Sequence, residues 1–192
     1  MSRLRFRLLG TILLLVLGCG GEPPEKEMQQ AQGAIDAARA AGASEYAADE
    51  FDAAVTALQR ARQAATDRDY RQALNDALDA RERAQTSARQ AADNMASARV
   101  DADRAISAAA ASLSATQKRL ADLETAKVPA RLLAAPRQAL EKTATLLQEA
   151  RASFEQGRYP AATEGARAAS KTIIEIGAQL DALVPSPARR GR

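Results

Sequence analysis

Hydrophobic positions recur at helical spacing between residues 26 and 183, and no stretch sustains an alternation of hydrophobic and polar residues. Ala, Leu, Gln, Glu, Arg and Lys dominate this region, and these residues have high helix propensities. The pattern therefore predicts an all-α fold in which antiparallel helical hairpins form an elongated bundle. No β-strand is expected.

Turn signals divide this region into five predicted helices, the first over about 25–41. The turns are predicted at 42–44, 67–69 and 128–129, at Gly157, and at 184–187. Val128 ends the third helix, because a residue before proline avoids the helical region. Pro136 is expected in the first turn of the fourth helix and Pro160 at the start of the fifth, where proline is tolerated.

The third helix, from Asp69 to about Ala126, contains neither Gly nor Pro and is expected to be long and central. Small residues recur along it in alternating steps of four and three, a heptad pattern typical of a coiled-coil-like seam. The seam consists of Ala84, Ala88, Ala91, Met95, Ala98, Ala102, Ala105 and Ala109. We expect it to be packed; the alternative is a solvated, Ala-rich helix.

Two segments that lie 89 residues apart share one pattern, which indicates an internal repeat. Its large core residues are expected to be Phe51, Leu58, Leu140 and Leu147. In each copy a turn, a Tyr and a second helix follow, and small residues three, seven and ten positions after the Tyr share one face of that helix. The predicted hairpin-packing residues are Tyr70, Ala73, Ala77, Tyr159, Ala162 and Ala166. Each Tyr ring is expected to pack over its turn with the hydroxyl still hydrated.

These elements predict a first helical hairpin region at 28–127, which includes the long helix, and a second hairpin at 128–184. Residues 185–192 are expected to form a disordered basic tail, because Arg189, Arg190 and Arg192 follow two prolines. Weak contact of this tail with an anionic surface is the alternative.

The N-terminus has the pattern of a secretory signal. Arg3, Arg5 and Arg7 precede an apolar run at 8–17, and Gly18 and Cys19 follow it. The run is too short for a transmembrane helix, which needs about 20 apolar residues. Cys19 is the only cysteine, so no internal disulfide can form and the thiol needs another explanation.

Val16-Leu17-Gly18-Cys19 resembles a bacterial lipobox. The resemblance implies a signal peptide at 1–18, cleavage between Gly18 and Cys19, and a diacylglyceryl and acyl lipid on Cys19. Residues 19–27 would then be the lipidated cysteine and a flexible tether, and Gly20 implies sorting to the outer membrane with the protein facing the periplasm. A secreted protein with a chance cysteine and an uncleaved anchor are the alternatives.

The net charge changes once the predicted signal peptide is removed. The whole chain has 27 basic and 24 acidic residues, but three of the basic ones lie in 1–18, so the remainder is neutral. Basic and acidic residues alternate along the helices, which is typical of a solvated face. No nucleic-acid partner is expected, also because the chain has only three Phe, three Tyr and no Trp for base stacking.

Candidate chemistry is sparse in this sequence. There is no His, and Cys19 is assigned to lipidation, so a Cys–His or Ser–His nucleophile and an ordinary zinc site are excluded. Carboxylate clusters occur at 49–52, 67–69, 76–79 and 101–103, and are expected on solvated helix faces or as helix caps. We expect no enzyme activity, no metal and no cofactor other than the covalent lipid.

The lipobox together with segment 37–91, which contains Ala-x-x-Leu and Asp-Tyr-x-x-Ala, resembles a family of small Ala-rich helical bacterial envelope lipoproteins whose shared domain has no known function. Gly157-x-Tyr159-x-x-Ala162 is locally similar to a tetratricopeptide-type hairpin. Cys19, the long third helix and the absence of catalytic groups lead us to expect a membrane-anchored scaffold whose partner is an envelope protein or a second copy. The alternative is a periplasmic binding module whose groove, lined by Tyr70 and Tyr159, holds a peptide or an apolar ligand.

Overall fold

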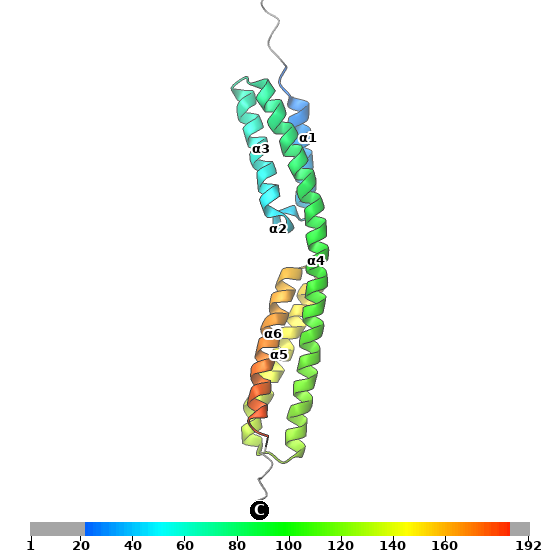
Figure 1. Cartoon of the computed structure of the whole chain (residues 1–192), viewed down its shortest axis with the longest axis vertical. Coiled ribbons are helices and arrows are strands. Elements are labelled where there is room, and N and C mark those ends of the chain that lie inside the picture. Colours follow the sequence, from blue (N-terminus) through cyan, green and yellow to red (C-terminus); the bar gives the residue numbers. More distant parts are fainter. Residues whose placement is uncertain (1–21, 185–192) are drawn as a thin grey trace, which may run out of the picture. The chain divides into compact units, whose positions relative to one another are not determined.

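The computed structural model describes residues 22–184, and this part of the chain is all-α, as predicted. The helices are α1 (Glu25–Ala40), α2 (Ala43–Tyr46), α3 (Ala48–Thr66), α4 (Tyr70–Thr125), α5 (Ala130–Glu155) and α6 (Tyr159–Asp181), as shown in Figure 1. The predicted signal peptide at 1–18, the lipidation site Cys19 and the tail at 185–192 lie outside the described residues. The predicted long central helix is α4, which has 56 residues.

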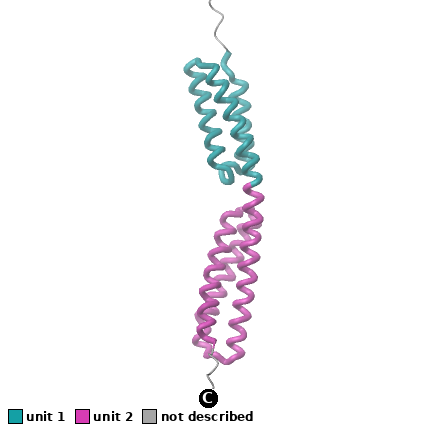
Figure 2. Tube along the Cα trace, viewed as in Figure 1, with its two compact units in different colours: residues 1–93 teal, residues 94–192 magenta. Residues whose placement is uncertain are grey.

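The chain divides into two compact units, Met1–Asp93 and Asn94–Arg192, coloured separately in Figure 2. The division falls inside α4, so this helix contributes one part to each unit. The predicted boundary between 127 and 128 therefore does not separate the units. The proline-containing turn at 128–129 joins two helices, α4 and α5, that share one core.

Unit 1 packs α1, α3 and the first part of α4 around a core of mostly small side chains. Its larger buried residues are Ile35 of α1 and Phe51 and Leu58 of α3. Ten buried alanines complete this core cluster, including Ala54 and Ala77, which have 0 % exposure. Small side chains bury little apolar area each but allow the helix backbones to approach closely.

Unit 2 packs the second part of α4 against α5 and α6 around a core with larger side chains. These core side chains are Ile106, Leu113, Leu120, Leu123, Leu133, Leu140, Leu147, Ile173, Ile176 and Leu180. Gly165 of α6 allows a close helix approach, since a Cβ built there would lie 3.2 Å from the Cβ of Ala150 in α5. The expected core positions Leu140 and Leu147 are confirmed at 2 % exposure each.

The two copies of the repeat form the same helix–turn–helix. After α3, the amides of Asp67, Arg68 and Asp69 donate to the carbonyls of Gln63, Ala65 and Ala64, which closes the helix end. After α5, the residues 89 positions later make the same three hydrogen bonds at 2.9–3.1 Å. The equivalent residues Arg68 and Gly157 both adopt a left-handed backbone conformation, with φ of 62° and 75°.

Two predicted helix starts differ from the structure. Pro136 was expected in the first turn of a helix, but α5 already begins at Ala130 and Pro136 lies buried inside it. In the first copy the equivalent residue, 89 positions earlier, is Ala47, where an extended φ of −148° separates α2 from α3. The second helix predicted after 42–44 is therefore interrupted at this point, whereas in the second copy the helix continues past the proline.

Candidate functional site

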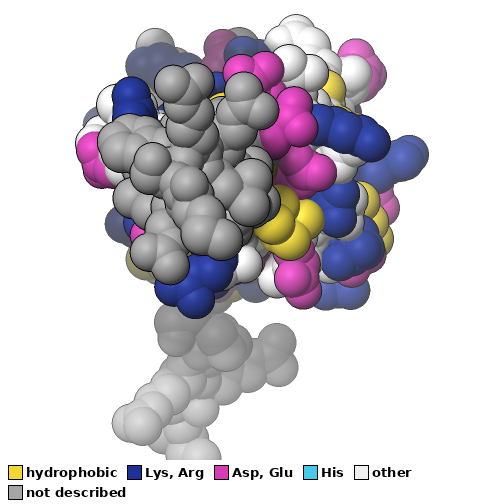
Figure 3. Space-filling view, turned by 90° about the horizontal axis from the view of Figure 1, so that it is seen from above, with side chains coloured by type: hydrophobic (Ala, Val, Ile, Leu, Met, Phe, Trp, Pro, Cys, Tyr) yellow, Lys and Arg dark blue, Asp and Glu magenta, His cyan; other side chains and the backbone are white. Residues whose placement is uncertain are grey.

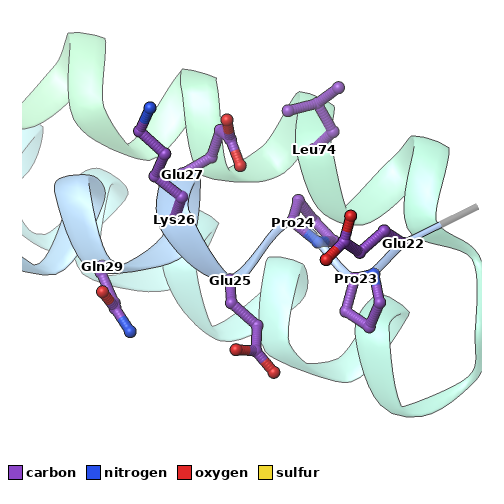
Figure 4. A pocket seen from close by; sticks show the side chains of 8 residues that line it. All are labelled: Glu22, Pro23, Pro24, Glu25, Lys26, Glu27, Gln29 and Leu74. Atoms are coloured by element: carbon purple, nitrogen blue, oxygen red, sulfur yellow. The ribbon is translucent and has the colours of Figure 1, made fainter.

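The described chain begins at the tether that follows the predicted lipidation site. The amide of Glu25 donates to the carbonyl of Pro23 at 2.8 Å and Pro24 is buried, so this segment lies against the start of α1. An open hollow of about 680 Å³ is formed here, and Figure 4 shows Leu74 of α4 beside the two prolines. Its lining is completed by Glu22, Glu25, Lys26, Glu27 and Gln29, whose polar groups extend in different directions.

Figure 3, which looks down the long axis of Figure 1, shows acidic, basic and hydrophobic side chains next to one another. The tether and first turn carry Glu22, Glu25 and Glu27 against a single Lys26. Residues 25–27 lie in α1 and Pro24 is buried, so the flexible tether predicted at 19–27 does not extend past residue 24.

The predicted seam residues of α4 are not buried as one continuous row. Ala84 and Ala91 are fully buried in the core of unit 1, and Ala102 and Ala109 in that of unit 2. Ala88 and Ala105 are partly buried against the same two cores. The heptad pattern therefore marks two intramolecular packing surfaces.

Between these two surfaces the seam is solvated. Residues 92–101 of α4 contain no buried side chain, and Met95 and Ala98 are only partly buried. Val100 is 54 % exposed. The expectation of a packed seam therefore has to be corrected for Met95 and Ala98, which follow the heptad but belong to neither core cluster.

The predicted hairpin-packing residues occupy equivalent positions in the two units. Their small members Ala73, Ala77, Ala162 and Ala166 all have 0 % exposure. The two tyrosines are half-buried, and the ring of Tyr159 packs edge-on against Phe154 with 5.4 Å between centroids. Tyr159 thus packs on the core of unit 2 beside its turn.

The binding-module alternative places Tyr70 and Tyr159 in one groove. Tyr70 begins α4 in unit 1 and Tyr159 begins α6 in unit 2. Neither tyrosine lines the hollow beside Pro23 and Pro24 or either of the two hollows on unit 2.

An ionic network crosses the surface between α3 and α4 in unit 1. Arg60 contacts the carboxylates of Asp76 and Asp79 at 3.2 Å each, and Arg83 contacts Asp79 at 2.9 Å and Glu50 at 3.1 Å. Asp76 is nearly buried, whereas the arginines are well exposed, so we expect each pair to contribute no more than about 1 kcal/mol to stability. The network holds the two helices in register on one side of the bundle.

The remaining carboxylate clusters also have structural partners. Asp69 caps α4, because its side chain accepts a hydrogen bond from the amide of Gln72 at 3.0 Å. Asp67 accepts from the side chain of Gln63, and Asp101 pairs with Arg104 at 3.5 Å. Within residues 22–184, no three acidic side chains are grouped so that they could hold a metal ion.

Two further hollows lie on unit 2, each between α4 and α6. One, of about 500 Å³, is lined by Ala98, Asp101, Pro160, Thr163, Glu164 and Arg167. The other, of about 320 Å³, lies where α4 and α6 end and is lined by Arg119, Asp122, Leu123, Ala126, Leu180, Asp181 and Val184.

The second of these hollows has one basic residue in its lining, Arg119, beside the acidic Asp122 and Asp181. Arg119 pairs with Asp181 at 2.9 Å, and Arg137 of α5 donates a hydrogen bond to Glu124. This hydrogen bond and the charge of Glu124 raise the pKa of Arg137 above its ordinary value. Net charge summed over the whole mature chain does not reveal these arginines, because the two signs cancel there.

No protein-family model, curated protein or solved structure matches the chain. The family resemblance drawn from segment 37–91 therefore stays a prediction. No helix among residues 22–184 is both long enough and apolar enough to cross a bilayer.

Proposed function

We propose that the chain is a lipid-anchored helical scaffold of the bacterial cell envelope, without a catalytic role. In this proposal Cys19 holds it in the outer membrane, and its helical units face the periplasm and contact an envelope protein or a second copy. The observation that carries the proposal is the sequence Val16-Leu17-Gly18-Cys19 directly after a basic and then an apolar segment.

The start of the folded region supports this proposal. Only five residues separate Cys19 from the first residue of α1, Glu25. A lipid on Cys19 would therefore keep the start of α1 near the bilayer surface, because the six residue steps from Cys19 to Glu25 span at most about 22 Å. Several acyl chains hold a protein durably, since each buried CH₂ contributes about 0.8 kcal/mol.

The packing of the two units supports the scaffold part of the proposal. In each unit, three helices close around a core and leave helix faces exposed to solvent. These faces carry isolated large apolar side chains, such as Ile174 at 71 % and Leu146 at 44 % exposure. Such surfaces suit contacts between helices of different molecules.

Replacing the cysteine tests the anchor directly. The wild type and Cys19→Ser are produced in a bacterium with an outer membrane, labelled with a radioactive fatty acid, and fractionated. We expect the wild type to carry the label and to sediment with outer membranes, and Cys19→Ser to carry none and to leave that fraction. Gly21→Ser is the matched control and should behave as wild type.

An unlabelled wild-type protein, or a Cys19→Ser protein that stays in the outer-membrane fraction, would contradict the proposal. A labelled wild type that sediments with the inner membrane would contradict only the sorting inferred from Gly20.

A further inference from the structure

Two exposed leucines lie near the start of α4, at the end of unit 1 where α1 begins. Leu74 and Leu78 are 37 % and 39 % exposed, and Leu74 lines the hollow of about 680 Å³ beside the tether. The residues 89 positions later, in the second copy of the repeat, are Thr163 and Arg167. Unit 1 therefore exposes apolar side chains where unit 2 carries polar ones.

Acidic side chains prevail at the same end of unit 1. We name residues 22–29 and 67–78 the acidic end; they contain six acidic and three basic side chains, a net charge of −3. Figure 1 shows that the start of α1 and the turn between α3 and α4 lie at one end of this unit. Among residues 22–184, no ion pair involves Glu22, Glu25 or Glu27. Their carboxylates are therefore available to a partner.

Unit 2 has the opposite charge where α4 turns into α5 and α6 ends. We name residues 118–137 and 178–184 the basic end; they contain five basic and three acidic side chains, a net charge of +2. Two of the five basic side chains pair with acidic residues of the same end. Lys127 and Arg131 are exposed, and neither takes part in an ion pair within the described part of the chain.

The basic end also exposes apolar side chains. Leu132, next to Arg131, is 45 % exposed, and Val184 is 55 % exposed. Val184 also lines the hollow of about 320 Å³, together with Leu123 and Leu180. The acidic end and the basic end therefore have the same make-up, exposed apolar side chains among charges, and are opposite in sign.

We propose that the acidic end of one copy of the chain docks on the basic end of a second copy. The carboxylates at the start of α1 pair with Lys127 and Arg131 of the second copy, and Leu74 and Leu78 contact its exposed apolar side chains. Because the two docking surfaces differ, each copy keeps one of them for a further neighbour, so the association is head to tail and continues beyond two copies.

This inference rests on the proposed function in one respect, since it names a second copy as the partner of the scaffold. A lipid anchor would confine the copies to one surface and so raise their effective concentration. Each docking surface is the end of a three-helix unit and carries only a few charges. We therefore expect the association to be weak in solution and sensitive to salt.

An anionic bilayer is the other occupant that would suit the basic end. It would leave the acidic end without a partner, because lipid phosphates repel carboxylates. It would also leave Leu74 and Leu78 unexplained. A second copy is favoured because one chain carries both complementary surfaces and each accounts for the other.

Sedimentation velocity tests the association without the lipid. The mature chain, residues 19–192 with Cys19→Ser, is measured from about 10 µM to about 1 mM, at about 20 mM and about 500 mM salt. We expect the average mass at low salt to rise with concentration past that of a dimer, and to return to that of a monomer at high salt. A negative result leaves the anchor unaffected, because the anchor is judged by labelling of Cys19.

Neutralising either end should weaken the association. Glu22→Gln with Glu25→Gln changes the acidic end, and Lys127→Asn with Arg131→Gln changes the basic end. Each exposed ion pair strengthens binding by up to about fivefold, so each double variant should weaken it about tenfold. An equimolar mixture of the two variants should regain association but stop at a dimer, because each variant brings one intact end.

Matched controls remove the same charges elsewhere in each unit. Asp49→Asn with Asp52→Asn changes two exposed residues at the start of α3, where Asp49 lies in the first turn as Glu25 does in α1. Lys142→Gln with Lys171→Gln changes two exposed lysines within α5 and α6. Each control should weaken the association less than about threefold. Circular dichroism verifies that every variant is folded.

Three results would overturn the proposal. The first is a monomer at every concentration at low salt; binding of this monomer to vesicles that contain phosphatidylglycerol would then identify a bilayer as the occupant. The second is equal weakening by the end variants and the controls, because net charge alone would then explain the association. The third is a mixture that associates no better than either end variant alone, which would show that the two ends do not meet.

Discussion

At the scale of single residues, the two copies of the repeat differ at the position that closes the first helix of each hairpin. Arg68 and Gly157 both have positive φ, a conformation that costs about 1 kcal/mol or more for a residue with a side chain and little for glycine. Lys127 ends α4 in the same way, with φ of 58°. The hydrogen bonds of each turn maintain this conformation whichever residue occupies it.

Exchanging the residue types at this position should change stability in opposite directions. Gly157→Ala should lower the free energy of unfolding by about 1 kcal/mol, because the left-handed backbone then carries a Cβ. Arg68→Gly should raise it by a similar or somewhat smaller amount. Urea denaturation measures both changes.

A glycine inside a helix provides the control for this pair. Gly33 lies in α1 with open space around its Cβ position, so Gly33→Ala should raise the free energy of unfolding by about 0.5–1 kcal/mol through helix propensity. If Gly157→Ala were as stabilising as Gly33→Ala, the positive φ of Gly157 would not persist in solution.

Much of the core could be predicted residue by residue, because helical spacing and the repeat both identify it. Phe51 and Leu58 are buried as expected, and so are the alanines at equivalent positions of the two copies. Met95 and Ala98 could not be distinguished from the packed seam residues, because a heptad records only which face of a helix a residue is on. A residue of α4 is buried only where another helix packs on it. The lengths of α3 and α5 determine which parts of α4 have such a neighbour.

At the scale of helices, α4 is longer than the helices that pack on it. It has 56 residues, whereas α3 has 19 and α5 has 26, and α3 and α5 belong to different units. About ten residues of α4 therefore lack buried side chains, in agreement with the burial of residues 92–101. The ends of α4 were predicted from Asp69 and from Val128–Pro129 because turn chemistry is local. The interrupted packing depends on distant helices and was not predictable.

Hydrogen exchange should reveal this difference within one continuous helix. Amides of residues 92–101 should exchange at least about tenfold faster than amides near Ala77 or Ala109, because local opening exposes no core there. Mass spectrometry of short peptides along α4 measures the rates. Uniform protection along the helix would indicate that another molecule or segment packs on residues 92–101 in solution.

Local sequence rules also failed to predict where α5 begins. Proline is disfavoured inside helices because it lacks an amide proton and its ring clashes with the preceding turn. Pro136 nevertheless lies in α5, where it is buried in the row that contains Leu133 and Leu140. Packing of this row therefore outweighs the local preference.

At the scale of the whole molecule, the two units have separate cores. The two core clusters share no residue, although both include residues of α4. The sequence indicated a repeat, but it did not show that a single helix would serve both units. The neutral net charge of the sequence after residue 18 also concealed a difference between the units. Residues 22–93 have fourteen acidic and nine basic side chains, and this acidic excess offsets the basic excess of residues 94–192.

Separate cores predict that damage to one unit is confined to it. Ile35→Ala should destabilise unit 1 by about 2–5 kcal/mol and leave exchange protection in α5 and α6 unchanged. Ile173→Ala, the matched change in unit 2, should leave protection in α1 and α3 unchanged. Native-state hydrogen exchange reports each unit separately. Equal loss of protection throughout in both variants would mean that the two units unfold as one.

The most direct test of the proposed anchor is the intact mass of the protein purified from bacterial membranes, followed by sequencing of its N-terminal peptide. We predict a chain that begins at Cys19 and carries a diacylglyceryl group on Sγ and an acyl group on its new amine. A chain that retains residues 1–18, or one that begins elsewhere and has an unmodified thiol or no Cys19, would contradict the account.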